Sequence, residues 1–355
     1  MKKLTVVVLI MLAGVLFFGR WVVTAPSAVK PIKLTFAIQD PESSWQSVEG
    51  DIPWIKAVEK ATMGQVVIEP YFAQTLVKGK DAFDAVKTGV CDIGWCVMGY
   101  WPGLTPLTEV ITLPFLPFKS GEQGSSVLWQ LYERFPELQK EFADVKVLKL
   151  WTTDPNFLMT TKKQVKTLED LKGLKIRVLG GPPIESLKAL GAVPTLVPMP
   201  DLYLALERGT LDGAGLMFPA GLPFRIHEVV KYYTHVPLYM TFFSVIMKLD
   251  KWNSLPADIQ KQIMSVSGFW GSTLQGYRVM DRAEEVYRER ALKDGYKMVE
   301  YVLPPEEVER WRKIGGVPLW EAWVKKQEAA GRPRAREILN TTLDLIKEYK
   351  PIHSK

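Results

Sequence analysis

The chain has 355 residues, of which 47% are hydrophobic and 24% are charged, a composition typical of a globular protein large enough for two domains. The formal net charge of +6 is spread along the chain without a basic block of interleaved aromatic residues, so the sequence gives no indication of nucleic-acid binding. Three scattered histidines are too few for a histidine-based metal site, and no metal or other cofactor is expected.

The first 28 residues have the pattern of a secretory signal, with two lysines followed by an apolar run over residues 4–18. The run is shorter than the roughly 20 residues that a membrane-spanning helix needs. The pattern leaves open whether the segment is a cleaved signal peptide or an uncleaved N-terminal anchor. In both cases the chain beyond about residue 30 is expected in the periplasm.

Strand and helix patterns alternate along the next part of the chain, which predicts an α/β fold with mainly parallel sheets. Strands are expected at residues 33–38, 66–72, 91–95, 145–151, 174–178 and 195–199, and helices at about 51–64, 79–89, 126–145 and 183–192. The apolar, proline-punctuated residues 106–118 suit a crossover or hinge better than a helix. Cys91 and Cys96 match neither a redox CxxC nor a zinc half-site, and we expect buried free thiols.

An internal similarity links the two halves. FDAVKTGVCDIG (residues 83–94) and YLALERGTLDGA (residues 203–214) both predict a helix that ends at a glycine and a short strand that begins at Asp92 or Asp212. Repeated units of this kind suggest two similar α/β lobes with a cleft between them.

Beyond residue 248 the sequence is mainly helical. Long amphipathic segments are expected at residues 256–295 and 304–331. Trp311, Trp320 and Trp323 lie at helical spacing, and we interpret them as packing residues rather than as a binding platform. The chain contains no GxSxG, HExxH, Walker or GxGxxG motif, so nothing in it favours an enzyme.

The segment LEDLKGLKIRV (residues 168–178) places Arg177 at the end of a short strand, just before a Gly-Gly turn. A cation at this position is well placed for a ligand in an α/β protein, although a surface arginine is the simpler interpretation.

Several motifs in one order give the chain a family resemblance. They include VEKATMGQVVIEPY, AVKTGVCDIGW, TLPFLPF, TLEDLKGLKIRV, VPMPDLYLALERGTLDG and WNSLPADIQ. In this order they resemble the substrate-binding proteins of tripartite ATP-independent periplasmic (TRAP) transporters, of the dicarboxylate-binding type. The resemblance implies a two-lobed periplasmic binding protein fold with a ligand cleft, hinge strands and a long helix that spans both lobes. It places lobe I at residues 30–153 plus about 243–275, and lobe II at residues 154–242 plus about 280–345 with the C-terminal helices.

The resemblance also implies that Arg177 pairs with the ligand carboxylate. The family's second arginine would fall at Phe157, its asparagine at Leu216, and an acidic residue of the first lobe at Val97. We expect these three apolar residues in the cleft, unless the alignment shifts locally and other residues supply polar groups. The other expected cleft residues are Met199, Phe218, Trp101, Trp151 and, for one hydrogen bond, Gln39.

The expected function is therefore capture of an organic acid, favouring a monocarboxylate with an apolar or aromatic body, and its delivery to a TRAP membrane permease. A receptor that presents its ligand to a sensor kinase, or a secreted enzyme that uses the same cleft, are the alternatives. The sequence does not decide between a monomer and a dimer.

Overall fold

The computed structural model describes residues 30–353, so the signal or anchor expected at residues 1–28 lies outside the described residues. All elements below belong to the compact unit Ile32–Lys355. Within the described part, no helix is both long and apolar enough to cross a membrane.

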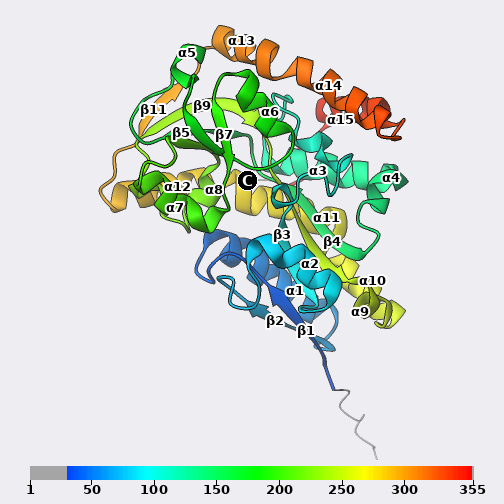
Figure 1. Cartoon of the computed structure of the whole chain (residues 1–355). Coiled ribbons are helices and arrows are strands. Elements are labelled where there is room, and N and C mark those ends of the chain that lie inside the picture. Colours follow the sequence, from blue (N-terminus) through cyan, green and yellow to red (C-terminus); the bar gives the residue numbers. More distant parts are fainter. Residues whose placement is uncertain (1–29, 354–355) are drawn as a thin grey trace, which may run out of the picture. The chain divides into compact units, whose positions relative to one another are not determined.

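The first sheet has five strands in the order β2-β1-β3-β10-β4, and we call the part of the molecule around it lobe I (Figure 1). Its strands are β1 (Ile32–Ala37), β2 (Val66–Tyr71), β3 (Ile93–Val97), β4 (Val145–Thr152) and β10 (Phe242–Lys248). Its helices are α1 (Ile52–Ala61), α2 (Ala82–Thr88), α3 (Gly121–Arg134), α4 (Pro136–Lys140), α9 (Leu249–Asn253) and α10 (Ala257–Ser265).

The second sheet has six strands in the order β11-β9-β5-β8-β6-β7, and we call its surroundings lobe II. Its strands are β5 (Asn156–Thr160), β6 (Lys175–Val178), β7 (Val193–Leu196), β8 (Gly213–Leu216), β9 (Tyr232–Tyr239) and β11 (Val299–Val302). Its helices include α5 (Leu168–Leu171), α6 (Pro182–Ala189), α7 (Met199–Glu207) and α8 (Phe218–Gly221).

Within the described residues, one strand of each sheet runs against the others, so the expectation of mainly parallel sheets is confirmed. β10 runs antiparallel to β3 and β4, and β5 runs antiparallel to β8 and β9. These two antiparallel strands adjoin the crossings between the lobes. β5 is the first strand after the chain crosses from lobe I to lobe II, and β10 is the first strand after it crosses back.

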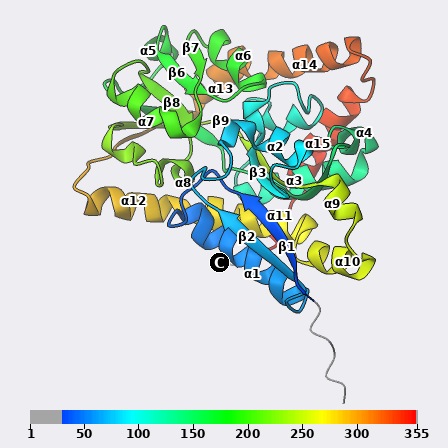
Figure 2. The ribbon, with the colours of Figure 1, turned by 60° about the horizontal axis from the view of Figure 1, so that its bottom comes forward.

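Several segments of residues 30–353 join the lobes. The crossing from β4 to β5 lies beside the crossing from β9 to β10, because the backbone N–H of Thr153 donates to the Thr241 carbonyl at 2.9 Å. The third connection is a helical stretch made of α11 (Gly268–Gln275), a π-helical turn (Gly276–Asp281) and α12 (Ala283–Lys293). Figure 2 shows this stretch passing from α11, which packs on β4, to α12, which packs on α8.

The C-terminal helices α13 (Pro305–Gly315), α14 (Val317–Ala329) and α15 (Ala335–Glu348) also connect the lobes. α13 packs on α6 of lobe II, whereas α15 packs on α3 of lobe I, so the C-terminal helices reach from one lobe to the other. Trp311, Trp320 and Trp323 are buried, which confirms that they pack.

Three local predictions need correction. The helix expected at residues 126–145 begins at Gly121, capped by the Ser120 hydroxyl, and it breaks at Phe135 because a residue before proline is disfavoured in a helix. The strand expected at residues 195–199 spans Val193–Leu196 instead, and Met199 begins α7. The long helix expected at residues 256–295 is interrupted at Gly268, which has a φ of 57°.

The two similar sequence segments also have similar local structures. After α2 and α7 the chain turns at Gly89 and Gly209, which have φ angles of 83° and 69°. Asp92 then accepts a hydrogen bond from the backbone N–H of Thr35 at 2.9 Å, and Asp212 accepts one from Lys175 at 2.8 Å. Each aspartate therefore ties its strand to the neighbouring parallel strand. Cys91 and Cys96 are free and buried, as expected.

The hydrophobic core is divided between the faces of the two sheets. In lobe I, Leu128 of α3 and Leu150 of β4 pack with Ile338 of α15. In lobe II, Ile176 and Val178 of β6 share a cluster with Trp311 of α13. The two sheets thus have their own packed faces, and a pocket lies where their strand ends meet.

Candidate functional site

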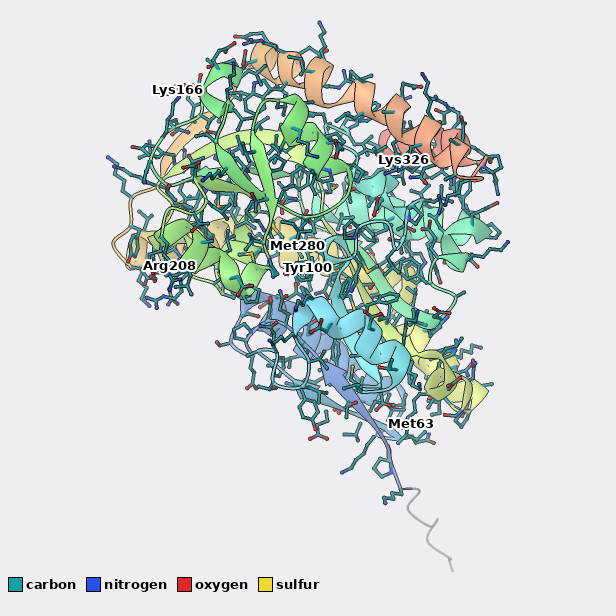
Figure 3. All side chains as sticks on the ribbon, in the orientation of Figure 1. Met63, Tyr100, Lys166, Arg208, Met280 and Lys326 are labelled. Carbon is teal, nitrogen blue, oxygen red and sulfur yellow. The ribbon has the colours of Figure 1, made fainter. Side chains whose placement is uncertain are left out.

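One pocket is built from both lobes and from the crossings between them. It is lined by Gln39, Asp40, Gln46, Trp95, Val97, Tyr100, Asn156, Arg177, Leu179, Met199, Leu216, Met217, Pro219, Ala220, Phe224, Thr241, Phe243 and Met280. Figure 3 labels Tyr100 and Met280, which lie in the region where the green elements of lobe II face the blue and cyan elements of lobe I. The site thus contacts both lobes, a hinge crossing and the π-helical turn.

Arg177 is the cation of this pocket. β6 carries it to the pocket edge, where the side chain is only 3% exposed. Its Nε donates to the Val197 carbonyl at 2.9 Å, and among residues 30–353 no carboxylate forms an ion pair with the guanidinium. Burial lowers the pKa of Arg177, while the nearby Tyr100 and Tyr239 hydroxyls act in the opposite direction. Because an arginine starts from a pKa above 12, the group stays charged and can receive an anion.

Tyr100 closes the pocket from the side of lobe I. Its hydroxyl accepts a hydrogen bond from the backbone N–H of Met199, at the start of α7 in lobe II, at 2.9 Å. The same hydroxyl donates to Oε1 of Gln39 at 3.0 Å. A second contact between the lobes joins the N–H of Gly180 to the Gly99 carbonyl at 3.0 Å. The lobes are therefore held together on this side of the site.

The hinge crossings form part of the pocket wall. Nδ2 of Asn156 donates to the Tyr239 carbonyl at 3.0 Å and approaches the hydroxyls of Thr153 and Thr241 at 3.2 and 3.3 Å. Asn156 and Thr241 both line the pocket. A bound molecule would therefore touch the two segments about which the lobes can move.

The lobe I side of the pocket contains a buried carboxyl group. Asp40 follows β1 and is 6% exposed. Burial, and secondarily the Asp51 carboxylate, raise the pKa of Asp40 to about 7, while a hydrogen bond from Gln39 acts to lower it. Burial raises the pKa of Tyr100, while Arg177 acts to lower it and Asp40 acts to raise it, so the tyrosine hydroxyl lies within reach of both charges.

The walls between these polar ends are apolar. Trp95 and Phe243 lie 5.2 Å apart between ring centroids, and Val97, Leu179, Leu216 and Met217 cover other sides. The space open to the centres of water-sized molecules is about 40 Å³, and one water needs about 10–15 Å³. The pocket is thus narrow and has polar groups only at specific points.

Five of the nine residues expected in the cleft line this pocket: Arg177, Gln39, Met199, Val97 and Leu216. The other four do not, and the alternation of side chains explains two of them. Phe157 is next to the pocket residue Asn156 on β5 but packs on His235 and Phe218, with ring centroids 4.9 and 4.7 Å apart. Phe218 follows Met217, which takes the pocket position.

Trp101 and Trp151 lie behind the pocket wall. Trp101 packs on Phe83 at 5.9 Å, because the 3-10 turn Met98–Tyr100 directs Tyr100 into the site. Trp151 is fully buried and stacks on Phe243 at 5.3 Å. These two tryptophans, like Phe157 and Phe218, support lining residues without lining the pocket themselves.

The sequence interpretation missed the polar residues of the site. Asp40, Tyr100 and Asn156 are each one position from a residue that was considered, whereas Gln46 and Thr241 are not near any of them. The signal for Asp40 was present, since it directly follows Gln39 at the end of the first strand. Asn156 instead of Phe157 supplies a polar group, as the alternative of a local shift in the alignment anticipates. In the described part of the chain, no group of three or more His, Cys, Asp or Glu side chains is arranged to hold a metal ion.

Comparison with known proteins decides the family. Residues 42–327 match the model for bacterial extracellular solute-binding protein family 7. The chain belongs to this family of TRAP solute-binding proteins.

Solved structures of TRAP solute-binding proteins share its fold. A protein from Rhodoferax ferrireducens with copurified benzoate is 29% identical, with a TM-score of 0.83 over 89% of this chain and 98% of that one. A marine metagenome protein in complex with 3-hydroxybenzoate is 29% identical, with a TM-score of 0.84 over 90% and 99%. A Bordetella bronchiseptica protein with bound (R)- and (S)-mandelate is 27% identical, with a TM-score of 0.82 over 90% and 99%. The two-lobed solute-binding fold expected from the motifs is confirmed.

Proposed function

We propose that this TRAP solute-binding protein captures a monocarboxylate with an aromatic or apolar body and delivers it to a membrane permease. The observation that carries the proposal is Arg177, a buried guanidinium in an apolar pocket with no carboxylate partner among the described residues. The relatives described above, which hold benzoate, 3-hydroxybenzoate and mandelate, support the same ligand class.

Arg177 recognises the ligand carboxylate through its guanidinium fork. Nε is already bonded to Val197, which fixes the plane of the group and leaves the two terminal nitrogens for a bidentate pair. In a dry pocket such a pair is strong, and a neutral ligand cannot replace it. Apolar groups of the ligand then pack between Trp95, Phe243 and Leu216.

A second carboxylate has no cation to receive it. Phe157 is packed in lobe II, and Leu216 and Val97 present only carbon to the pocket. A buried carboxylate without a partner costs about 1–3 kcal/mol or more. The pocket therefore selects monoacids over C4 dicarboxylates.

Capture proceeds by closure of the lobes. A ligand on Arg177 of lobe II that also touches Trp95 and Phe243 of lobe I stabilises the arrangement in which Tyr100 meets Met199. The closed lobes are the form that the membrane permease receives. Arg177 and the apolar walls supply binding and orientation, and the pocket needs no bond-breaking step.

The test is a thermal-shift screen of the mature protein against benzoate, phenylacetate, mandelate, 3-methylbutanoate, succinate and a sugar acid. An acid at about 100 times its Kd stabilises the folded protein by roughly 2.7 kcal/mol, which raises Tm measurably. Arg177→Ala should abolish the response. Arg208→Ala, which removes an exposed arginine at the end of α7, is the matched control and should respond like the parent.

Two results would contradict the proposal. One is a larger shift with succinate or the sugar acid than with any aryl or branched-chain monoacid. The other is an equal response of parent and Arg177→Ala. Recovery of the bound acid unchanged after prolonged incubation separates capture from turnover.

A further inference from the structure

The ligand pocket has a second polar end that the proposed function leaves unused. Asp40 lines the pocket from lobe I, whereas Arg177 lines it from lobe II, and the Asp40 side chain is buried. A carboxyl group in an apolar cavity is costly unless a donor satisfies it, so its donors need to be identified.

The described side chains provide Asp40 with few hydrogen-bond donors. Gln39 is the one side chain that donates to it, and Oε1 of Gln39 is already held by Tyr100 at 3.0 Å. The nearest buried lysine, Lys149, donates to Gln275 at 3.0 Å, and its charge acts on Asp51. Within residues 30–353, no lysine, arginine or histidine forms an ion pair with Asp40.

The neighbours of Asp40 are mostly acceptors or acids. Gln46, which also lines the pocket, has its amide nitrogen directed at Asp51, at 3.3 Å from each carboxylate oxygen. Asp51 on the π-helical turn before α1 is the charge that faces Asp40, and Tyr100 is the nearest hydroxyl. Among the described residues, Asp40 therefore has one side-chain donor, Gln39, while the amide of Gln46 is engaged with Asp51.

We infer that Asp40 is a specificity-determining residue that selects monocarboxylates carrying a hydrogen-bond donor, a hydroxyl or an amine, at the end remote from the carboxylate. Such a ligand spans the pocket, with its carboxylate on Arg177 in lobe II and its donor on Asp40 in lobe I. The donor also joins the lobes, because each lobe then holds one end of the same molecule. This inference rests on the proposed function, since it assigns the second end of the same site.

Burial and Asp51 support this assignment, since they raise the pKa of Asp40 to about 7. A neutral hydroxyl can donate to the ionised carboxylate and can accept from the protonated acid, so it fits both forms. An ammonium group requires the ionised form. The two kinds of donor are therefore distinguishable by pH.

The experiment measures Kd by calorimetry for matched pairs of acids that differ only in the donor. The pairs are 3-hydroxyphenylacetate with phenylacetate, 3-hydroxybenzoate with benzoate, and, for the cation, 4-(aminomethyl)benzoate with 4-methylbenzoate. A hydrogen bond to a charged group is worth about 1.5–3 kcal/mol, so at least one donor-bearing acid should bind the parent roughly tenfold or more tightly than its partner.

Asp40→Leu should bring that ratio to about one, mainly by weakening the donor-bearing acid. Asp40→Asn keeps an acceptor oxygen without the charge, so it should retain part of a hydroxyl preference and lose an ammonium preference. Asp250→Leu makes the same change at an aspartate outside the pocket, whose side chain is 87% exposed, and should leave the ratio as in the parent. Because unsubstituted acids are measured on every variant, a misfolded variant is recognised by its failure to bind them.

A parent that binds phenylacetate or benzoate through Arg177 but shows no preference for any donor overturns the inference and leaves the proposed function intact. A preference that persists in Asp40→Leu also overturns it, because another group then reads the donor. If no acid of either kind binds the parent, the proposed function fails and this inference fails with it.

Discussion

Lys149 of lobe I and Arg177 of lobe II are both buried basic side chains, but they differ in the partners that the protein gives them. Lys149 on β4 donates to Gln275, lies 4.7 Å from the ring centroid of Trp54, and faces the buried Asp51. Arg177 on β6 has one backbone carbonyl and, in the described chain, no carboxylate partner. Lys149 is thus supplied with partners by the fold, whereas Arg177 is left with unused donors that open into the pocket.

The difference distinguishes a charge that stabilises the fold from a charge that is available to a ligand, although the two side chains are similarly buried. A buried ion pair holds its own region together, and removing one partner is costly because the other is left uncompensated. A buried charge that lacks a partner in the protein costs folding free energy and is instead available to a ligand. Asp40 belongs to the second kind, which places one unsatisfied group on each lobe.

The largest expected effect is on stability, from Lys149→Met. The change leaves Asp51, which is fully buried, without its cation, so the free energy of unfolding should fall by about 3–5 kcal/mol in urea titration. Adding Asp51→Asn should recover much of the loss. Lys146→Met on the same strand, where the lysine is half-buried, should cost far less. A loss below about 1 kcal/mol for Lys149→Met would mean that the pair does not stabilise lobe I.

The second largest expected effect is a pH dependence of the free energy of unfolding that arises from Asp40. Its pKa in the folded chain is about 7, against 3.8 when unperturbed, so the folded state binds the proton more tightly than the unfolded state. Stability from this group therefore falls as pH rises from about 4 to about 7. In the absence of ligand, Asp40→Asn should be more stable than the parent, by more at pH 8 than at pH 5, with a ceiling of about 4 kcal/mol.

Urea titration at both pH values measures this difference. Asp344→Asn, at an aspartate whose side chain is 65% exposed, controls for the general effect of replacing a carboxyl group by an amide. An equal advantage of Asp40→Asn at pH 5 and pH 8 would mean that the carboxyl group is satisfied in the folded protein. Lobe I would then lack the unsatisfied group that the comparison assigns to it.

Local patterns were enough to predict the repeated part of the fold. The helix-glycine-strand units around Asp92 and Asp212 follow from turn chemistry and hydrophobic period, and both aspartates bond to the neighbouring strand. The antiparallel strands that adjoin the crossings between the lobes, and the packing of α15 on lobe I, depend on contacts far apart in sequence. No local pattern specifies such contacts, so the sequence analysis did not predict these features.

Some of the residues that line the pocket were among those named from the sequence, and others were not. Arg177 was found because a family motif contains it, and Val97 and Leu216 because they stand at positions defined by that motif. Phe157, Trp101, Trp151 and Phe218 were expected one residue or one layer away from the actual lining residues, because a shift of one position on a strand reverses the side chain. Asp40 and Tyr100 were missed because their role depends on the other lobe.

The smallest expected effect is the most direct test of the comparison. Arg177→Gln removes a buried guanidinium whose protein partner is the Val197 carbonyl, and the glutamine amide can still reach towards it. The loss of about one hydrogen bond is offset by the removal of a desolvated charge, so the free energy of unfolding without ligand should change by no more than about 1 kcal/mol in either direction. The same variant should no longer be stabilised by carboxylic acids. If Arg177→Gln instead unfolds as readily as Lys149→Met, then the protein itself holds the guanidinium in place, and Arg177 is a structural cation like its counterpart in lobe I. If Arg177→Gln has the stability of the parent but no longer responds to carboxylic acids, then the guanidinium serves ligand binding and not the stability of lobe II.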